Sequence, residues 1–477
     1  MLGLQAATQS TVTNMMKNPI ASARGLSRIA FAAALVAVLS ACGGGDSGGG
    51  TGEQALAQPI RNCVPNKSCF TVGGSITGLT ASGLVLADGA GTVSLGPGAT
   101  WFTFPTYRPK KTNYLVTVTT QPTGQQCSLV NGTGVMDHAT VTNISVTCAD
   151  VIVSTLAGSG SLGSTDGTGT ASSFARPSGV AVDSAGNLYV ADSSNNKIRK
   201  ISPAGVVSTV AGTGAVGSTD GTGTAASFFF PNGVASDGVG NLYVADSANN
   251  KIRKITPTGE VSTLAGTGAR GRDDGPGTAA SFNYPQGVAV DSAGNVYVAD
   301  MNNSIIRKIT PAGEVSTLAG NGAIGSVDGT GTAASFFFPN GVALDSAGNV
   351  YVADTGNEKI RKITPVGLVS SLAGTATIIG SADGTGTAAS FNYPMHIATD
   401  SAGNVYVGDS ANQKIRKITS TGVVSTLAGT GAIGATDGAG NVASFNYPHG
   451  IAVDTAGNVY VGDSSNNRIR KIAQPSP

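Results

Sequence analysis

Few side chains in this chain of 477 residues could carry out acid–base, nucleophilic or metal chemistry. Three histidines and four glutamates are present, and the glutamates stand in a Gly-rich stretch or at expected strand ends away from the inner strands. His396 and His449 occupy neighbouring copies of one repeated motif, so their imidazoles could meet. Two imidazoles alone make a poor metal site, because catalytic zinc usually has three protein ligands. No serine or cysteine stands beside a base in a recognisable triad order.

Aspartate, by contrast, recurs at three positions of a repeated unit. The first set ends the stretch "GNLYVAD" or its variants, and consists of Asp192, Asp246, Asp300, Asp354, Asp409 and Asp463. We expect these carboxylates to accept N–H groups of the next turn, or to pair with the arginine that follows. The second set is expected to shape a hairpin turn, and consists of Asp183, Asp237, Asp291, Asp345, Asp400 and Asp454.

The third set of aspartates precedes glycine in a long linker, and consists of Asp166, Asp220, Asp274, Asp328, Asp383 and Asp437. Calcium takes six to eight oxygen ligands, and one acid per linker falls short of that number. We therefore predict an Asx-turn that holds the linker. No lysine follows these glycines, which disfavours a phosphate-binding loop. No cofactor is predicted, although Ca²⁺ or Zn²⁺ stays open.

The elements that must position these residues come from one unit repeated from residue 151 to residue 473. Its copies lie 54 or 55 residues apart, and each contains four strand-like pieces, for example "SGVAVD", "GNLYVAD", "NKIRKI" and "VVSTVAG". Four short antiparallel strands per unit are typical of a propeller blade. The first outer strand, near 151–158, precedes any complete unit, and the last unit lacks one. The sequence therefore predicts an all-β, six-bladed β-propeller closed by one strand plus three, which removes the open sheet edge.

The repeated motifs "P-x-G-V-A-V-D", "G-N-x-Y-V-A-D" and "N-x-x-I-R-K-I" resemble the NHL repeat family. The linkers between blades are longer here than in the usual NHL unit. The resemblance implies an NHL-type propeller, and NHL-like propellers include lyases and gluconolactonase-like hydrolases with an axial metal. Those enzymes need a convergent set of His, Glu or Asp, which this sequence does not offer.

Positions where the blades differ point to a binding face. The residue before the motif proline is Arg176, Phe230, Tyr284, Phe338, Tyr393 or Tyr447, and His396 replaces a glycine of the other blades. These residues enter the innermost strand, so we expect them to rim the central channel together with His449. Aromatic and polar groups around a concavity suit ligand binding, although aromatics could instead pack between blades. We predict a binding or scaffold protein that recognises protein or glycan, with the axial-metal enzyme as the alternative.

A different module is expected at 61–150, where "YLVTVTTQP" and "TVTNISVTC" alternate apolar and polar residues. We predict a small antiparallel β-sandwich that resembles Ig-like modules of bacterial surface proteins. Four cysteines fall here and indicate two disulfides with three possible pairings. Proximity in the sequence favours Cys63–Cys69 and Cys127–Cys148.

The N-terminus reads as a bacterial lipoprotein signal over 1–41. Basic residues precede an eleven-residue apolar run at 29–39, too short to span a bilayer as a helix. "LSAC" then resembles a lipobox, so Cys42 is the expected lipid carrier, followed by a Gly-rich tether at 42–60. In the proteobacterial lipoproteins that this segment resembles, Asp after the cysteine marks inner-membrane retention, so Gly43 implies the outer membrane. A net charge of +1 disfavours nucleic-acid binding, and we expect a monomer anchored in the cell envelope.

Overall fold

A computed structural model describes Pro65 and residues 68–475 of the chain. The regular elements are β-strands and three-residue 3₁₀ turns, as the alternating, breaker-rich sequence predicts. Within this described part, no helix reaches the length and apolar character needed to cross a membrane. The predicted signal segment, Cys42 and the predicted tether lie outside the described residues.

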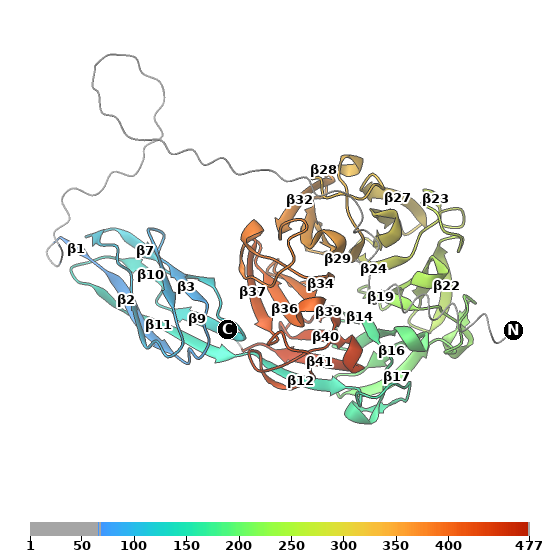
Figure 1. The fold of residues 1–477 in the computed structure, drawn as a ribbon, viewed down its shortest axis with the longest axis horizontal. Helices are drawn as coiled ribbons and strands as arrows, with labels where there is room; N and C mark the ends of the chain where they lie inside the picture. The colour runs from blue at the N-terminus through green and yellow to red at the C-terminus, as the bar shows by residue number, and fades with distance from the viewer. Residues whose placement is uncertain (1–64, 66–67, 476–477) are drawn as a thin grey trace, which may run out of the picture. The chain divides into compact units, whose positions relative to one another are not determined.

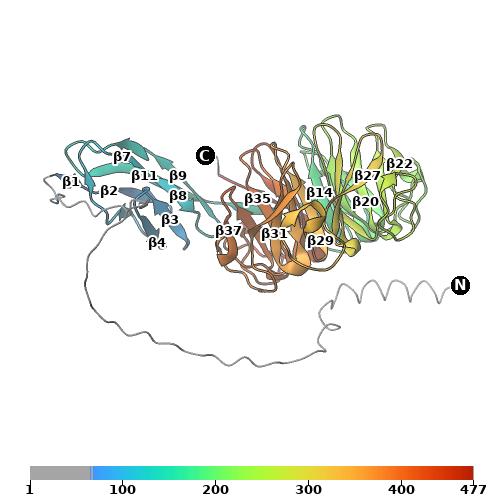
Figure 2. The ribbon, with the colours of Figure 1, turned by 90° about the horizontal axis from the view of Figure 1, so that it is seen from above.

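The strands before the propeller form two main sheets. One sheet has the order β5-β2-β11-β9, the other β4-β3-β8, and two pairs, β1-β6 and β10-β7, lie beside them. Figure 2 shows β3 and β4 on one side of this module and β9 and β11 on the other. The bounds are β1 Cys69–Phe70, β2 Val72–Thr77, β3 Leu84–Ala87, β4 Thr92–Leu95, β5 Trp101–Thr103, β6 Arg108–Pro109, β7 Asn113–Leu115, β8 Thr117–Thr120, β9 Gln125–Val130, β10 Thr133–Val135 and β11 Val141–Asp150.

Side chains from both sheets of this module share one apolar core, which includes Val72, Leu86 and Phe104. The Cys127–Cys148 disulfide joins β9 to β11 and confirms the expected pairing. Cys69 is also disulfide-bonded, while its expected partner Cys63 lies outside the described residues. The sheets are not wholly antiparallel, because β11 pairs with β2 in the parallel direction. The Ig-like character of the module stays a prediction.

Six five-stranded sheets form the propeller, and Figure 1 shows them arranged around a centre. The innermost strands are β14 Pro177–Val182, β19 Pro231–Ser236, β24 Pro285–Val290, β29 Pro339–Leu344, β34 Pro394–Thr399 and β39 Pro448–Val453. The second strands are β15 Leu188–Asp192, β20 Leu242–Asp246, β25 Val296–Asp300, β30 Val350–Asp354, β35 Val405–Asp409 and β40 Val459–Asp463. We number the blades 1 to 6 in this order.

The outer part of each blade completes the sheet. The third strands are β16 Lys197–Ile201, β21 Lys251–Ile255, β26 Ile305–Ile309, β31 Lys359–Ile363, β36 Lys414–Ile418 and β41 Arg468–Ala473. The fourth strands are β17 Val206–Ala211, β22 Glu260–Ala265, β27 Glu314–Ala319, β32 Leu368–Ala373, β37 Val423–Ala428 and β12 Ile152–Ala157. Second strands are buried on both faces between neighbouring blades, which explains their continuous apolar character.

A fifth strand, which the sequence did not indicate, comes from the long linkers. Two linker residues pair with the fourth strand in every sheet, as β13 Gly167–Thr168, β18 Gly221–Thr222, β23 Gly275–Pro276, β28 Gly329–Thr330, β33 Gly384–Thr385 and β38 Gly438–Ala439. The linkers therefore cover the outer edges of the blades, where a free strand edge would invite pairing with another chain.

The ring closes as predicted. Strand β12 pairs antiparallel with β41, so that Val153 lies opposite Ile472, and the order β38-β12-β41-β40-β39 completes blade 6. Innermost strand β14 of blade 1 packs beside β39 of blade 6, as β19 packs beside β14. One strand from the start of the propeller thus holds the last blade.

The repeated aspartates are structural. In blade 1, Arg199 is fully buried between Asp192 at 2.8 Å and Asp166 at 2.6 Å, and lies 5.2 Å from the Phe174 ring centre. Every blade repeats this network. The Asx-turn predicted for the third set is therefore wrong, because those carboxylates bind the arginine and a threonine or serine of the fourth strand instead. The second set does form hairpin turns, as Asp183 shows by accepting the N–H of Asn187.

Candidate functional site

The six residues before the motif proline share a strained backbone. Their φ values are positive: 52° at Arg176, 54° at Phe230, 58° at Tyr284, 50° at Phe338, 58° at Tyr393 and 56° at Tyr447. This left-handed region disfavours residues with a Cβ and is an outlier for bulky side chains. All six innermost strands begin with the next residue, so these six residues form one ring at one end of the innermost strands. We call this ring the rim. Its aromatics are half-buried and Arg176 is exposed.

Side chains from the preceding blade hold the rim in this conformation. Asn196, which ends a 3₁₀ turn of blade 1 with φ 52°, accepts the N–H of Phe230 in blade 2 at 2.9 Å. Its amide nitrogen donates to the Gly214 carbonyl at 3.2 Å. Asn467 of blade 6 binds Arg176 of blade 1 in the same way, which joins the ends of the ring. These contacts between blades were not predicted, although an asparagine repeated after "DSSN" or "DSAN" indicates a left-handed residue.

Beneath the rim lies a ring of buried side chains, which we call the floor. It consists of the residues after the motif proline together with His396: Ser178, Asn232, Gln286, Asn340, Met395, His396 and His449. Each is at most 8% exposed. None carries a formal charge when the imidazoles are neutral, so the floor is polar but uncharged.

The structure brings the two predicted histidines together. The ring centres of His396 and His449 lie 4.7 Å apart. The Nε2 atom of His396 lies 3.1 Å from Oδ1 of Asn232, which comes from blade 2, opposite blade 5 in a ring of six. His396 therefore reaches across the axis. Burial lowers the pKa of His396 to about 4, and burial beside His396 lowers that of His449 well below its usual range. Both imidazoles are neutral at pH 7.

Glycine explains how the innermost strands come so close. A Cβ added at Gly287 would meet the Asn340 carbonyl of the next blade, and one added at Gly341 would lie 2.6 Å from the His396 Cα. Blade 5 has His396 in place of this glycine. Blades 5 and 6 also have Gly408 and Gly462 where the other blades have alanine. A Cβ at Gly408 would lie 3.0 Å from the His449 carbonyl, so the smaller residue relieves crowding beside the histidine pair.

Three polar atoms of the floor have no hydrogen-bond partner among the described residues. They are Nε2 of Gln286, Oδ1 of Asn340 and Nδ1 of His449. Unpaired buried polar atoms are costly, and native proteins keep few of them. No cluster of three or more His, Cys, Asp or Glu that could hold a metal occurs in the described part of the chain. Without carboxylates the floor does not suit calcium, which prefers many oxygen ligands.

Tyrosines and one carboxylate make one side of the rim distinct. The ring centres of Tyr393 and Tyr447 lie 6.1 Å apart, with the rings tilted by 39°. Glu358 accepts the N–H of Tyr393 at 2.6 Å, at the latch position that asparagine occupies in blades 1, 2 and 6. Our expectation that the glutamates lie away from the inner strands is thus wrong for Glu358. Burial raises the pKa of this carboxyl to about 7, and that of Tyr284 to about 12.

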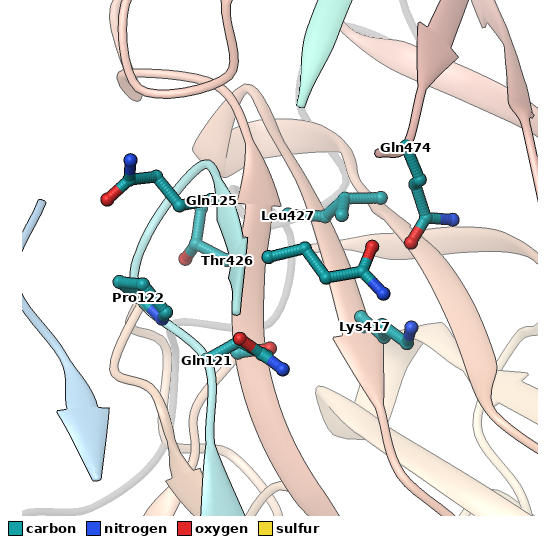
Figure 3. A pocket seen from close by; sticks show the side chains of 9 residues that line it. Gln121, Pro122, Gln125, Lys417, Thr426, Leu427 and Gln474 are labelled. Atoms are coloured by element: carbon teal, nitrogen blue, oxygen red, sulfur yellow. The ribbon is translucent and has the colours of Figure 1, made fainter. Parts of the chain in front are cut away.

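A small pocket elsewhere contains none of these residues. Figure 3 shows its lining, which is Gln121, Pro122, Gln125, Gln126, Lys417, Ser425, Thr426, Leu427 and Gln474. Four of these nine residues are glutamines, and Lys417 is its one cationic residue. It offers no arrangement for acid–base chemistry.

The fold and this site define a six-bladed β-propeller in which the rim residues lie beside a buried, polar floor. The NHL repeat model matches the blade residues 174–201, 282–309, 336–363 and 445–472, so the chain contains NHL repeats. The chain is 33% identical over 265 residues to Protein SUPPRESSOR OF QUENCHING 1, chloroplastic, from Arabidopsis thaliana, covering 52% of this chain and 25% of that protein. It is 29% identical over 336 residues to NHL repeat-containing protein 2 of Bos taurus, covering 51% and 46%. The chain thus spans less than half the length of these relatives.

Solved structures share the fold at low sequence identity. A protein of unknown function from Bacteroides thetaiotaomicron has a TM-score of 0.55 and 19% identity, covering 86% of this chain and 99% of that one. An auxiliary nutrient binding protein from the same organism has a TM-score of 0.53 and 15% identity, covering 85% and 97%. These similarities establish the fold alone.

Proposed function

We propose that this protein is a binding protein of the bacterial cell envelope. Its propeller rim recognises a protein or a glycan and does not catalyse a reaction on it. The observation that supports this most is the rim itself. Six bulky residues keep a costly left-handed backbone around one channel mouth, and such strain concentrates at functional sites. Five of the six are aromatic, which supplies contact area at small entropic cost.

The floor beneath the rim supports binding rather than catalysis. Its polar groups are neutral, and no nucleophile is paired with a base there. An axial-metal enzyme has less support, because the carboxylates that such a centre needs are absent from the floor residues. The Bacteroides propeller described as an auxiliary nutrient binding protein illustrates that this fold can serve a binding role.

The double variant Tyr393→Ala/Tyr447→Ala is expected to fold normally and lose binding. The two rings contact each other on the rim and belong to none of the apolar core clusters between blades. We would pass wild type and variant over immobilised envelope fractions, separated into protein and glycan, and measure the retained amount. We expect at least about a tenfold loss, as for removal of a paired aromatic contact.

The matched control is Val239→Ala/Val366→Ala, which removes two exposed apolar side chains from turns at the ends of the blade strands opposite the rim. Its retention should equal that of wild type. Unchanged retention of the tyrosine variant on every fraction that captures wild type would contradict the proposed function.

We further propose that Cys42 is lipidated and anchors the protein, in the outer membrane. The support is the lipobox-like "LSAC" and the absence of aspartate at position 43. Growth with an alkyne fatty acid should label the wild-type protein, and the Cys42→Ser variant should take up no label. Equal labelling of the two would show that the lipid, if any, is attached elsewhere.

A further inference from the structure

The soft metal ligands of the propeller gather at one place. The propeller has two histidines, His396 and His449, and two methionines, Met301 and Met395. Three of these four are floor residues, and Met301 Sδ lies 4.0 Å from Nδ2 of the floor residue Asn340. Other blades carry different residues at the equivalent positions. They have glycine where blade 5 has His396, asparagine where blades 5 and 6 have Met395 and His449, and serine where blade 3 has Met301. Three of these four departures from the template are floor residues of blades 5 and 6, and the fourth, Met301 of blade 3, contacts a floor residue of blade 4.

The hydrogen bonds determine which imidazole atoms are free to bind an ion. The amide oxygen of Asn232 can only accept, so His396 donates its Nε2–H to it and leaves a lone pair on Nδ1. This is the arrangement of metal-bound histidines, which usually donate their other ring N–H to an oxygen acceptor. Nδ1 of His449 is buried and has no partner among the described residues. The ring centres of the two histidines lie 4.7 Å apart, so their imidazoles are neighbours on the floor.

The absence of anionic side chains on the floor favours a monovalent ion over a divalent one. Neither a carboxylate nor a thiolate is among its residues, so a divalent ion would bring two uncompensated charges into a buried site. A monovalent soft ion brings one, and it prefers the imidazole and thioether ligands that are present.

We propose that the channel floor is a copper(I) site, in which His396 and His449 bind the ion through Nδ1 and a methionine thioether completes the coordination. This inference goes beyond the recognition role of the rim, since it rests on the floor residues and requires no contact with Tyr393 or Tyr447. Copper is bound as Cu⁺ and no electron is transferred.

The purified full-length protein should take up one equivalent of Cu⁺ under anaerobic conditions in competition with bicinchoninic acid. The variants His396→Gly and His449→Asn restore residues that other blades carry at these positions, so they should keep the fold. We expect each to lower the Cu⁺ affinity at least about 100-fold, because a ligand is lost rather than a supporting group. The variant Met301→Ser/Met395→Asn should lower the affinity about tenfold. His138→Asn, at an exposed histidine outside the propeller, should leave it unchanged.

X-ray absorption of the copper-loaded protein provides a second readout. We expect the edge of Cu⁺ with two nitrogen scatterers and one sulfur scatterer, and loss of the sulfur signal in the methionine variant. Absence of stoichiometric Cu⁺ uptake by wild type would overturn the proposal. So would equal uptake by the His396→Gly/His449→Asn double variant, or zinc binding that is tighter than Cu⁺ binding. Retention on envelope fractions, which tests the rim, is measured in the absence of copper. The proposed recognition role and the proposed copper site can therefore be contradicted independently of each other.

Discussion

Replacing Val153 with aspartate should strongly destabilise the propeller. Val153 is 1% exposed on the closing strand β12, pairs with Ile472 and packs in the core shared with Ile415 and Phe445. A carboxyl group in this core has no partner, and we expect a loss of about 3–5 kcal/mol in the free energy of unfolding. For a domain of this size the melting temperature should drop by roughly 10 °C. Circular dichroism during heating would measure it.

The control for this variant lies one residue away. Ile152 is on the same strand but 47% exposed, so Ile152→Asp should cost less than about 1 kcal/mol. Limited proteolysis of Val153→Asp should release peptides of β41 first, because β41 loses its neighbour. If Val153→Asp melts like Ile152→Asp, strand β12 does not hold the ring closed.

Replacing Arg307 with methionine should cost a similar amount for an electrostatic reason. Its guanidinium is fully buried and binds Asp300 at 3.0 Å and Asp274 at 2.7 Å. Methionine keeps most of the apolar stem but leaves Asp300 buried without its cation. Breaking a buried pair from one side costs about 3–5 kcal/mol. Urea denaturation would measure the loss, with Lys308→Met, a substitution at the adjacent residue, as the control.

The loss caused by Arg307→Met should depend on pH. Burial already raises the pKa of Asp300 from 3.8 to about 6, although Arg307 opposes this shift. Without Arg307 the pKa rises further, so the folded variant holds a proton that the unfolded chain has released. Stability from this proton is full below pH 4 and decreases as the pH rises through 6 and above. The deficit should therefore be larger at pH 8 than at pH 5.

The double variant Arg307→Met/Asp300→Asn distinguishes two causes of the lost stability, the unpaired charge of Asp300 and the lost packing of Arg307. It removes both charges, so it should be more stable than Arg307→Met and should lose the pH dependence. A deficit for Arg307→Met that is equal at pH 5 and pH 8 would attribute the loss to packing.

Much of the propeller follows from the sequence because its strands are encoded locally and repeated. Each "GNxYVAD" and "IRKI" is short, β-rich and bounded by turn residues, so a blade can be recognised without knowing its neighbours. The sequence has six copies of the unit, and one outer strand stands before the first complete unit. This order predicts that the first strand completes the last blade, and the pairing of β12 with β41 confirms it. The Cys127–Cys148 disulfide followed from proximity in the chain for a similar reason. The sandwich was harder, because β2 and β11 pair in parallel although about 70 residues separate them.

The sequence alone thus determined the repeat, the blade and the ring of template-breaking residues around the axis. Only the tertiary structure decided what those residues contact, because their partners come from other blades. Asn232 meets His396 across 164 residues, and Asn467 latches Arg176 across 291. The linker aspartates show the same limit, since Asp166 binds Arg199 and Thr209 rather than its own turn. Distances between blades depend on the closed ring, where glycine backbones bring the innermost strands together, and local sequence patterns carry no information about that geometry.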